Sequence, residues 1–468
     1  MRLIQVTVDL LCLVLAYAVG RFARYLWNRQ PMDLLVIDGS ATLFALSALF
    51  AVALFFMAQG HYVRRRPFWE ELRTVVNTLA AAAAVNAVLT LVTKQYVPVT
   101  QYLASWSAAI LLIPAGRYLL RNYLLRIGLW QRPTVIVGTG PNAREAWAAL
   151  ATEPLMGFEV VAFVGLSGAA AEDAPAPALP CGAGIPVEPA SAWGIERLMQ
   201  HQVVIALEGS DGGEQAEWLA RLARAGHREV FLAPTLRGLA LHGMEITHFF
   251  RHELLLLGVR NNLARKGPRL LKRVFDVMAS LLLLSLLAPV LAWIAARIRL
   301  SGGPAIFSHA RVGQNGRVFL CYKFRTMVPN AERMVQQLLE ADPRARREWE
   351  REFKLRNDPR VTRLGQALRE TSLDELPQIW NVLKGDMSLV GPRPVVPEEL
   401  QRYGDDRSFY LQVRPGITGL WQISGRNDVD YGYRVSLDTW YVRNWSLWYD
   451  VAILMKTVSV VLGRKGAY

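Results

Sequence analysis

Residues Val274–Ile298 read VFDVMASLLLLSLLAPVLAWIAARI, an almost uninterrupted apolar run of 25 residues. A helix needs roughly 20 apolar residues to cross the hydrocarbon layer of a bilayer, so length alone allows this run to span a membrane. Lys272 and Arg273 precede the run and Arg299 follows it. Because Lys and Arg concentrate on the cytoplasmic side of membrane segments, both ends of this run are predicted to lie on that side.

Pro289 lies in the middle of this apolar run. A proline frees the carbonyl four residues earlier, here that of Ser285, and its ring forces a kink. The Ser285 hydroxyl is one turn away and is expected to ease the lost hydrogen bond. We therefore predict a re-entrant helix over residues 274–300 that enters and leaves by one leaflet, with its kink at Ser285 and Pro289. An ordinary kinked spanning helix is the alternative.

Four more apolar runs occupy the first 130 residues. They lie near Ile4–Val19, Leu34–Met57, Leu72–Thr93 and Leu103–Leu125. Four such runs in succession are rare in soluble cores and predict four transmembrane helices. Arginine clusters at 64–66 and 117–132 indicate that these two places, and the N-terminus, are cytoplasmic. The first run contains Asp9, so its ends are the least defined, and no cleavage site typical of a signal peptide follows it.

The composition excludes several classes of protein. The chain has 468 residues, of which 52% are hydrophobic, and a net charge of +14. Its three cysteines rule out a disulfide scaffold. Basic residues are in excess in the first 130 residues and after residue 260, the parts that also carry the apolar runs, whereas acidic residues prevail between them. This pairing favours an anionic membrane surface over nucleic acid as the partner.

The segment 131–260 has the pattern of an α/β module. Thr134–Gly140 reads TVIVGTG and leads into a helical stretch, which is the start of a βα unit with G-x-G-x-x-A spacing. Further strands are predicted at Glu159–Gly165, Val203–Glu208 and Glu229–Ala233, with a helix at Glu214–Ala225. The second strand ends without the acidic residue that holds the ribose of NAD. We therefore favour a Rossmann-like module without NAD, for dimerisation or regulation, over a cofactor domain.

After residue 300 the chain contains several basic blocks rich in Pro and Gly. They are YKFRTM (322–327), RETSLDELPQ (369–378), GPRP (391–394), RPGITGLWQ (414–422) and SGRN (424–427). Stiff turns that each hold an arginine present planar donors to phosphate oxygens. These blocks predict a site for phosphorylated substrates.

Asp374 and Glu375 are adjacent carboxylates within this basic set. One carboxylate can attack phosphorus while the other binds a divalent metal or handles a proton. Ser372-x-x-Glu375 also fits a capping box, which would make the pair a helix start. The two interpretations are compatible, since a helix N-terminus beside the carboxylates would attract phosphates.

Other catalytic patterns are missing from the sequence. There is no HExxH, no G-x-S-x-G and no phosphate loop of the G-x-x-x-x-G-K-[ST] type. The glycine loop at 138–143 leaves one other function open, that of a membrane-bound NAD-dependent sugar-nucleotide dehydratase or epimerase. The Tyr-x-x-x-Lys pair that such an enzyme needs does not occur in the chain. A second rival function is a non-catalytic membrane scaffold for polysaccharide assembly, in which Asp374 and Glu375 only begin a helix.

From Leu271 to Tyr468 the ordered blocks KRVFDV, YKFRTM, TSLDELPQ, SLVGPRP, RPGITGLWQISGRN and LDTWYVRNWS closely resemble the bacterial sugar transferase family. These are monotopic polyprenyl-phosphate hexose-1-phosphate transferases, and the N-terminal spans and the α/β module resemble its large members. Family members usually kink the re-entrant helix at a Ser-Pro pair, whereas this chain has Ala288-Pro289.

The resemblance implies transfer of hexose-1-phosphate, galactose favoured over glucose, from UDP-hexose to undecaprenyl phosphate with release of UMP. It assigns the phosphosugar-bearing nucleophile to Asp374 and the metal- or proton-handling role to Glu375, with Mg²⁺ as cofactor at this pair. The implied substrate-binding residues are Lys323, Arg325, Arg369, Arg393, Arg414, Gln422, Arg426 and Asp438.

The expected architecture is therefore a mixed α and α/β membrane protein. We expect a four-helix transmembrane region (1–130), a Rossmann-like cytoplasmic module (131–260) and a mainly α monotopic catalytic domain (261–468). It should lie in the bacterial inner membrane with the catalytic domain on the cytoplasmic face. A homodimer is expected and nucleic acid is not an expected partner. The implied pathway is synthesis of O-antigen, capsule or exopolysaccharide.

Overall fold

The structure is a computed structural model in which the chain forms two compact units, Met1–Leu236 and Arg237–Tyr468. It describes residues 2–28, 38–57, 60, 62, 65–165, 184–208, 212–227, 230–235, 244–248, 255–258, 262–329, 331–341, 358–424 and 430–462. The predicted domain boundary at residue 130 lies inside the first unit and stays a prediction.

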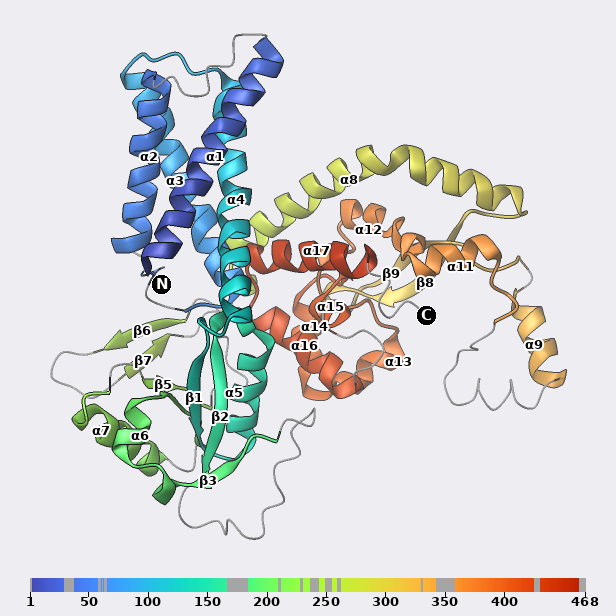
Figure 1. Cartoon of the computed structure of the whole chain (residues 1–468). Helices are drawn as coiled ribbons and strands as arrows, with labels where there is room; N and C mark the ends of the chain where they lie inside the picture. Colours follow the sequence, from blue (N-terminus) through green and yellow to red (C-terminus); the bar gives the residue numbers. More distant parts are fainter. Residues whose placement is uncertain are drawn as a thin grey trace. The chain divides into compact units, whose positions relative to one another are not determined.

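The first unit begins with a bundle of four helices (Figure 1). They are α1 (Arg2–Asn28), α2 (Gly39–Met57), α3 (Phe68–Val92) and α4 (Val99–Arg126). By length and composition α1, α3 and α4 can each cross a membrane, and α2 is a shorter apolar helix. The four predicted helices are thus present, and α1 extends well beyond its predicted end at Val19.

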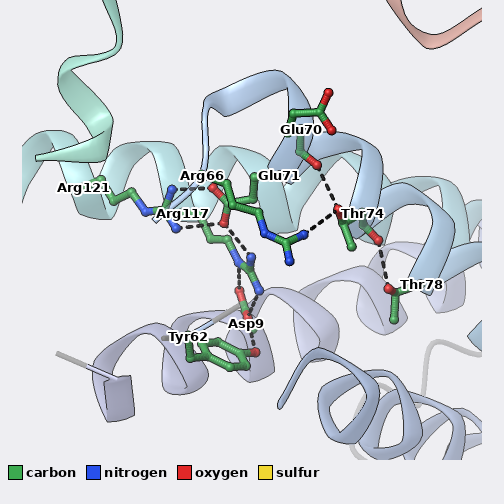
Figure 2. Close-up of polar contacts among 9 residues, drawn as sticks. All are labelled: Asp9, Tyr62, Arg66, Glu70, Glu71, Thr74, Thr78, Arg117 and Arg121. Atoms are coloured by element: carbon green, nitrogen blue, oxygen red, sulfur yellow. Dashed lines mark hydrogen bonds and ion pairs between the residues drawn. The ribbon is translucent and has the colours of Figure 1, made fainter. Parts of the chain in front are cut away.

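Charged side chains form a buried network inside this bundle (Figure 2). The Arg117 guanidinium of α4 donates to Asp9 of α1 at 2.6 and 2.9 Å and to Glu71 of α3 at 2.7 Å. Arg121 also donates to Glu71, and the Tyr62 hydroxyl donates to Asp9 at 2.5 Å. Ionisable groups among apolar helices are costly unless they are paired. This pairing explains how α1 tolerates Asp9.

The segment between α2 and α3 ties the bundle to the α/β part of the same unit. The Arg65 guanidinium donates to the carbonyls of Met156 and Gly157 at 2.8 Å each and to that of Trp130 at 2.9 Å. The Trp130 indole donates to the Leu155 carbonyl at 2.7 Å. The arginine cluster that predicts a cytoplasmic loop therefore also fastens two substructures, although Arg64 itself lies outside the described residues.

The rest of the first unit is a five-stranded parallel sheet with strand order β3-β2-β1-β4-β5. Its strands are β1 (Arg132–Val137), β2 (Phe158–Gly165), β3 (Val187–Pro189), β4 (Gln202–Ile205) and β5 (Val230–Leu232). Its helices are α5 (Pro141–Thr152), η1 (Pro154–Met156), η2 (Ala190–Ala192), α6 (Ile195–Met199) and α7 (Gly212–Arg224). The four predicted strands and the predicted helix of this segment are confirmed, and β3 is an addition.

The second unit is mostly helical. Its first elements are β6 (Glu245–His248), β7 (Leu255–Gly258), η4 (Asn262–Ala264), α8 (Lys266–Leu300), β8 (Ile306–Val312), η5 (Gln314–Gly316), β9 (Val318–Phe324) and α9 (Ala331–Ala341). Then follow α11 (Arg363–Glu370), η6 (Leu373–Glu375), α12 (Gln378–Lys384), β10 (Ser388–Val390), α13 (Pro397–Leu400) and η7 (Gln401–Asp406). The last are α14 (Arg407–Gln412), β11 (Gly416–Thr418), α15 (Leu420–Ile423), α16 (Tyr431–Arg443) and α17 (Leu447–Leu462).

Helix α8 carries the apolar run around Pro289 and bends part-way along its length (Figure 1). It is also long and apolar enough to cross a membrane. Both halves of α8 nevertheless pack against other elements of the second unit. Phe275 and Ala279 lie in a core with β10 and α12, whereas Ile294 and Ile298 lie in a core with β9 and α11. Most of the surface between these contacts is exposed and apolar.

Candidate active site

The antiparallel pair β8 and β9 supplies the first cation of the site. Phe307 pairs with Lys323, so Lys323 lies near the end of the hairpin. The Lys323 Nζ lies 2.5 Å from Glu375 Oε1. The predicted substrate-binding lysine and the predicted carboxylate pair are therefore neighbours.

The turn that carries the carboxylates is strained and is not a capping box. Ser372 has a φ of 55° and makes no cap hydrogen bond with its side chain, which contradicts the capping-box interpretation. Asp374 and Glu375 lie in η6, a single 3₁₀ turn, and α12 begins only at Gln378. A left-handed serine costs of order 1 kcal/mol and persists where the surroundings impose it, commonly at functional sites.

The electrostatics of Asp374 differ from those of an exposed carboxyl. Burial, followed by the charge of Glu375, raises the pKa of Asp374 to about 6, while Lys323 and Arg369 act in the opposite direction. Arg369 Nε donates to Thr326 Oγ1 at 3.0 Å. Two cations that are far apart in sequence, Lys323 of β9 and Arg369 of α11, thus both act on the carboxyl of Asp374 in η6.

Asn381 of α12 ties this cluster together. Its buried side chain accepts from the Tyr322 backbone N–H at 3.0 Å and donates to the Leu320 carbonyl at 2.8 Å. The same amide also donates to Asp386 at 3.3 Å. Because Tyr322 precedes Lys323, this contact sets the position of β9 relative to the segment with the carboxylates. No motif in the sequence pointed to Asn381.

Asp438 of α16 is the centre of a second polar group. The Tyr403 hydroxyl donates to its carboxyl at 2.8 Å. Burial raises the pKa of Asp438 to about 7, and Tyr403 and Arg393 act against that rise. The Arg393 guanidinium lies 5.5 Å above the Trp421 ring. Asp438 and Arg393, both predicted to bind substrate, are therefore neighbours.

Backbone hydrogen bonds join two of the glycine-containing blocks, GPRP (391–394) and RPGITGLWQ (414–422). Gly391 N–H donates to the Thr418 carbonyl at 2.9 Å, and Gly416 N–H donates to the Pro392 carbonyl at 2.8 Å. A Cβ on Gly416 would lie 2.1 Å from the Gly391 nitrogen. Glycine is required here because two backbones meet, and the contact holds Arg393 in place.

Some predicted residues have other contacts in the structure. Arg325 donates to the Ser301 hydroxyl at 3.1 Å and to carbonyls at the C-terminal end of α8. Arg414 donates to the Gly385 carbonyl at 2.8 Å, after α12. The Gln422 side-chain nitrogen donates to the Ile417 carbonyl at 3.3 Å. Arg426 lies outside the described residues. In the structure the first three thus donate to backbone carbonyls or a hydroxyl of the second unit and not to the carboxylate pair.

The donors at the carboxylate pair fit the predicted cation. Asp374 and Glu375 offer the hard oxygen ligands that Mg²⁺ prefers, and Mg²⁺ is usually held by one or two carboxylates together with substrate phosphates and water. Within the described ranges no cluster of three or more His, Cys, Asp or Glu side chains occurs. An all-protein cage is therefore not the arrangement that these residues offer.

The glycine loop of the first unit holds a carboxylate of its own. Glu208 Oε1 accepts from the Asn142 backbone N–H at 2.7 Å, at the start of α5. The Asn142 side chain donates to the Leu207 and Ala233 carbonyls at 3.0 and 2.7 Å. A dinucleotide would place its pyrophosphate at this helix end. The Glu208 carboxylate takes that position, which disfavours the NAD-dependent alternative.

Residues 267–464 match the bacterial sugar transferase family. The chain belongs to this family and is a membrane-associated transferase. It is 44% identical over 427 residues to an undecaprenyl-phosphate galactose phosphotransferase of Salmonella typhimurium, an alignment that covers 91% of this chain and 88% of the relative. It is 43% identical over 425 residues to a UDP-galactose-lipid carrier transferase of Erwinia amylovora, covering 90% and 87%.

A shorter relative matches a smaller part of the chain. An exopolysaccharide production protein of Rhizobium meliloti is 50% identical over 198 residues, which is 42% of this chain and 88% of the relative. These relatives confirm the family that the motifs after residue 271 indicate, and they place the chain among proteins of polysaccharide synthesis.

Proposed function

We propose that this enzyme transfers hexose-1-phosphate from UDP-hexose to undecaprenyl phosphate, with galactose favoured as the hexose. The products are undecaprenyl-diphospho-hexose and UMP, and the reaction is the first membrane step of O-antigen, capsule or exopolysaccharide synthesis. Two long alignments support this substrate pair, since one relative is named for undecaprenyl phosphate and galactose and the other for UDP-galactose and a lipid carrier. The single observation that carries the mechanism is the buried Asp374 carboxyl, whose pKa the charges of both Lys323 and Arg369 act to lower.

The proposed reaction has two displacements at one phosphorus. The Asp374 carboxylate attacks the phosphorus that bears the sugar, a bond from its oxygen to phosphorus forms, and the bond to the UMP oxygen breaks. An oxygen of undecaprenyl phosphate then attacks the same phosphorus and expels the carboxylate, which regenerates the enzyme. A covalent intermediate allows one site to serve both substrates in turn, with ping-pong kinetics. Lys323 and Arg369 stabilise the charge that develops on the phosphoryl oxygens.

Mg²⁺ would be held by Asp374 and Glu375, and when bound it supplies positive charge to the diphosphate. The residues of this chain have separate tasks. Lys323 holds Glu375 in place, Arg369 is oriented by Thr326, and Asn381 joins β9 to α12, the helix that follows the η6 turn.

We also propose that α8 is re-entrant and that the catalytic unit lies on the cytoplasmic face of the inner membrane. The packing of both halves of α8 against one polar unit supports this topology, because a straight spanning helix would separate its ends by the thickness of the bilayer. The exposed residues Ser285 and Pro289 lie one turn apart in its middle part.

The decisive experiment on the chemistry uses Asp374→Asn in full-length enzyme in nanodiscs with UDP-galactose carrying radioactive phosphorus next to the sugar. We expect wild type to release UMP and retain label on protein, and Asp374→Asn to do neither. Persistent UMP release by Asp374→Asn would contradict the role of Asp374 as nucleophile, whereas a wild-type enzyme that releases no UMP would favour a dehydratase or a scaffold. A panel of UDP-sugars, with label measured in lipid, then identifies the donor.

Topology is tested separately with single cysteines at two exposed sites, Tyr96→Cys between α3 and α4 and Glu398→Cys in α13. In intact cells a membrane-impermeant thiol reagent should label the first and spare the second until the inner membrane is opened. Labelling of Glu398→Cys in intact cells would place the catalytic unit outside. Mass photometry in nanodiscs checks the expected homodimer.

A further inference from the structure

Arg311 on β8 lies on the same face of the β8–β9 hairpin as Lys323. Arg311 pairs with Phe319, His309 with Cys321 and Phe307 with Lys323. Directly paired residues of antiparallel strands share a face, and side chains along a strand alternate between faces. Arg311 and Lys323 therefore lie at two ends of one row, roughly 13 Å apart for four residues of extended strand.

The end of β8 also lies beside the GPRP loop. The Val312 backbone N–H donates to the Val395 carbonyl at 2.9 Å. The Tyr410 hydroxyl donates to the Val312 carbonyl at 2.8 Å and accepts from the Val395 N–H at 3.2 Å. These bonds fix Arg311 next to the segment that begins with Arg393.

Arg311 and Arg393 are neighbouring cations, with the carboxyl of Glu399 in the surroundings of Arg311 and that of Asp438 near Arg393. Neither guanidinium donates a hydrogen bond or makes an ion pair with any residue that the structure describes. The neighbouring carboxyl of Asp438 is engaged by Tyr403. Burial, followed by the charge of Arg393, lowers the pKa of Arg311, and Glu399 acts in the opposite direction without cancelling this effect.

This arrangement is costly in the free enzyme. A half-buried guanidinium beside a like charge loses hydration and gains repulsion. Arginine forks match phosphate oxygens in bidentate geometry, and two of them would be neutralised by one phosphate dianion. Arg360 of the same unit is instead neutralised within the protein, by an ion pair with Asp358 at 2.6 Å.

We infer that Arg311 and Arg393 bind a phosphate group of a substrate, at a subsite separate from the Lys323–Glu375 end of the row. The phosphate belongs either to the nucleotide or to the polyprenyl phosphate, and both present the same oxygens to the two arginines. The inference rests on the proposed function for the identity of these substrates, whereas the anion site itself rests on the geometry of the hairpin and the loop.

Equilibrium binding to the full-length enzyme in nanodiscs tests this, with UMP and undecaprenyl phosphate as probes at constant magnesium. The variants are Arg311→Gln, Arg311→Lys and, as matched control, Arg317→Gln, an exposed arginine at the other side of the hairpin turn. We expect Arg311→Gln to weaken one probe about 10- to 100-fold, as for loss of a charged hydrogen bond. Arg311→Lys should give an intermediate loss, and Arg317→Gln none.

Each possible result either supports or contradicts the inference. Weaker binding of UMP assigns the site to the nucleotide phosphate, and weaker binding of undecaprenyl phosphate assigns it to the lipid. If Arg311→Gln binds both probes as Arg317→Gln does, the inference is wrong. Where Arg311→Gln does not fold, Arg311→Lys decides by the same comparison. Binding needs no turnover, so this test is independent of the reaction. If Arg311→Gln weakens binding as expected while Asp374→Asn still releases UMP, the inference holds and only the proposed mechanism is refuted.

Discussion

The Lys323 side-chain nitrogen lies 2.5 Å from the Glu375 carboxylate and joins β9 to the η6 turn. The side chains are 33% and 30% exposed. Exposed ion pairs contribute only about 0–1 kcal/mol to stability, so this pair contributes little to holding the fold together. Its consequence is local, because it places a cation beside Asp374.

Replacing Lys323 by Met should therefore separate activity from stability. We expect UMP release to fall about 100-fold or more, the range seen when one electrostatic donor of an active site is removed, with little change in Tm. Lys384→Met is the control, since Lys384 pairs with Asp386 at 3.5 Å at the end of α12. A Lys323→Met enzyme as active as this control would contradict the assignment.

Asn381→Ala should reduce both stability and turnover. The substitution leaves the part-buried Tyr322 N–H and Leu320 carbonyl without their partner, and the loss of a typical hydrogen bond costs about 0.5–1.5 kcal/mol. We expect a lower Tm and a lower kcat, since β9 carries Lys323. Gln366→Ala, at an exposed position of α11, should match wild type. An Asn381→Ala enzyme with unchanged Tm would show that the contact is dispensable.

Gly416→Ala should disrupt the contact between the two glycine blocks. Its Cβ would lie 2.1 Å from the Gly391 nitrogen, so one backbone must move. We expect lower Tm and loss of activity, because the displaced loop carries Arg393. Gly267→Ala is the matched substitution, as its Cβ meets nothing within 4 Å. Equal behaviour of the two variants would refute the role of this close approach.

In the helix bundle, Arg117→Gln should be severely destabilising. It leaves Asp9 and Glu71 buried with fewer counterions, and breaking a buried pair costs about 3–5 kcal/mol. The double variant Asp9→Asn/Arg117→Gln should lose less than the sum of its single variants, because these residues share bonds. Thermal unfolding monitored by fluorescence measures this. Arg126→Gln, at the exposed end of α4, is the control, and additive losses would exclude coupling.

Stability should depend on pH through Asp438, whose pKa of about 7 lies above the value near 3.9 of an unfolded aspartate. Below pH 4 the carboxyl is protonated in both states. Between pH 4 and 7 the unfolded state loses the proton first, so this group lowers stability as pH rises, with the full loss reached above pH 7. The groups facing it are Tyr403, Arg393 and Glu399.

Asp438→Asn removes that dependence. The difference in Tm between Asp438→Asn and wild type should therefore grow in favour of the variant from pH 4 to pH 7. Asp405→Asn, at an exposed position of η7, should show a constant difference. A constant difference for Asp438→Asn would mean that the carboxyl is ionised throughout this range.

The sequence predicted those features that depend on neighbouring residues. Apolar runs of sufficient length marked α1 to α4 and α8, and alternating β-branched runs marked β1, β2, β4 and β5. Pro289 predicts a kink, and α8, which contains this proline, bends part-way along its length (Figure 1). The motifs around Asp374 identified the family, which the long alignments confirm. Each of these signals is local, since hydrophobic periodicity and turn chemistry act within a few residues.

Pairings between distant residues were decided only by the tertiary structure. The Asp9 carboxylate is paired with Arg117, which lies 108 residues away in the sequence. Ser372, the first residue of the capping-box pattern, has a left-handed backbone conformation just before a 3₁₀ turn. Arg325 and Arg414 carry the same guanidinium as Arg369, yet backbone carbonyls bind the first two. A guanidinium bonds to whichever oxygens the packed chain brings to it, and that depends on contacts that no local pattern records.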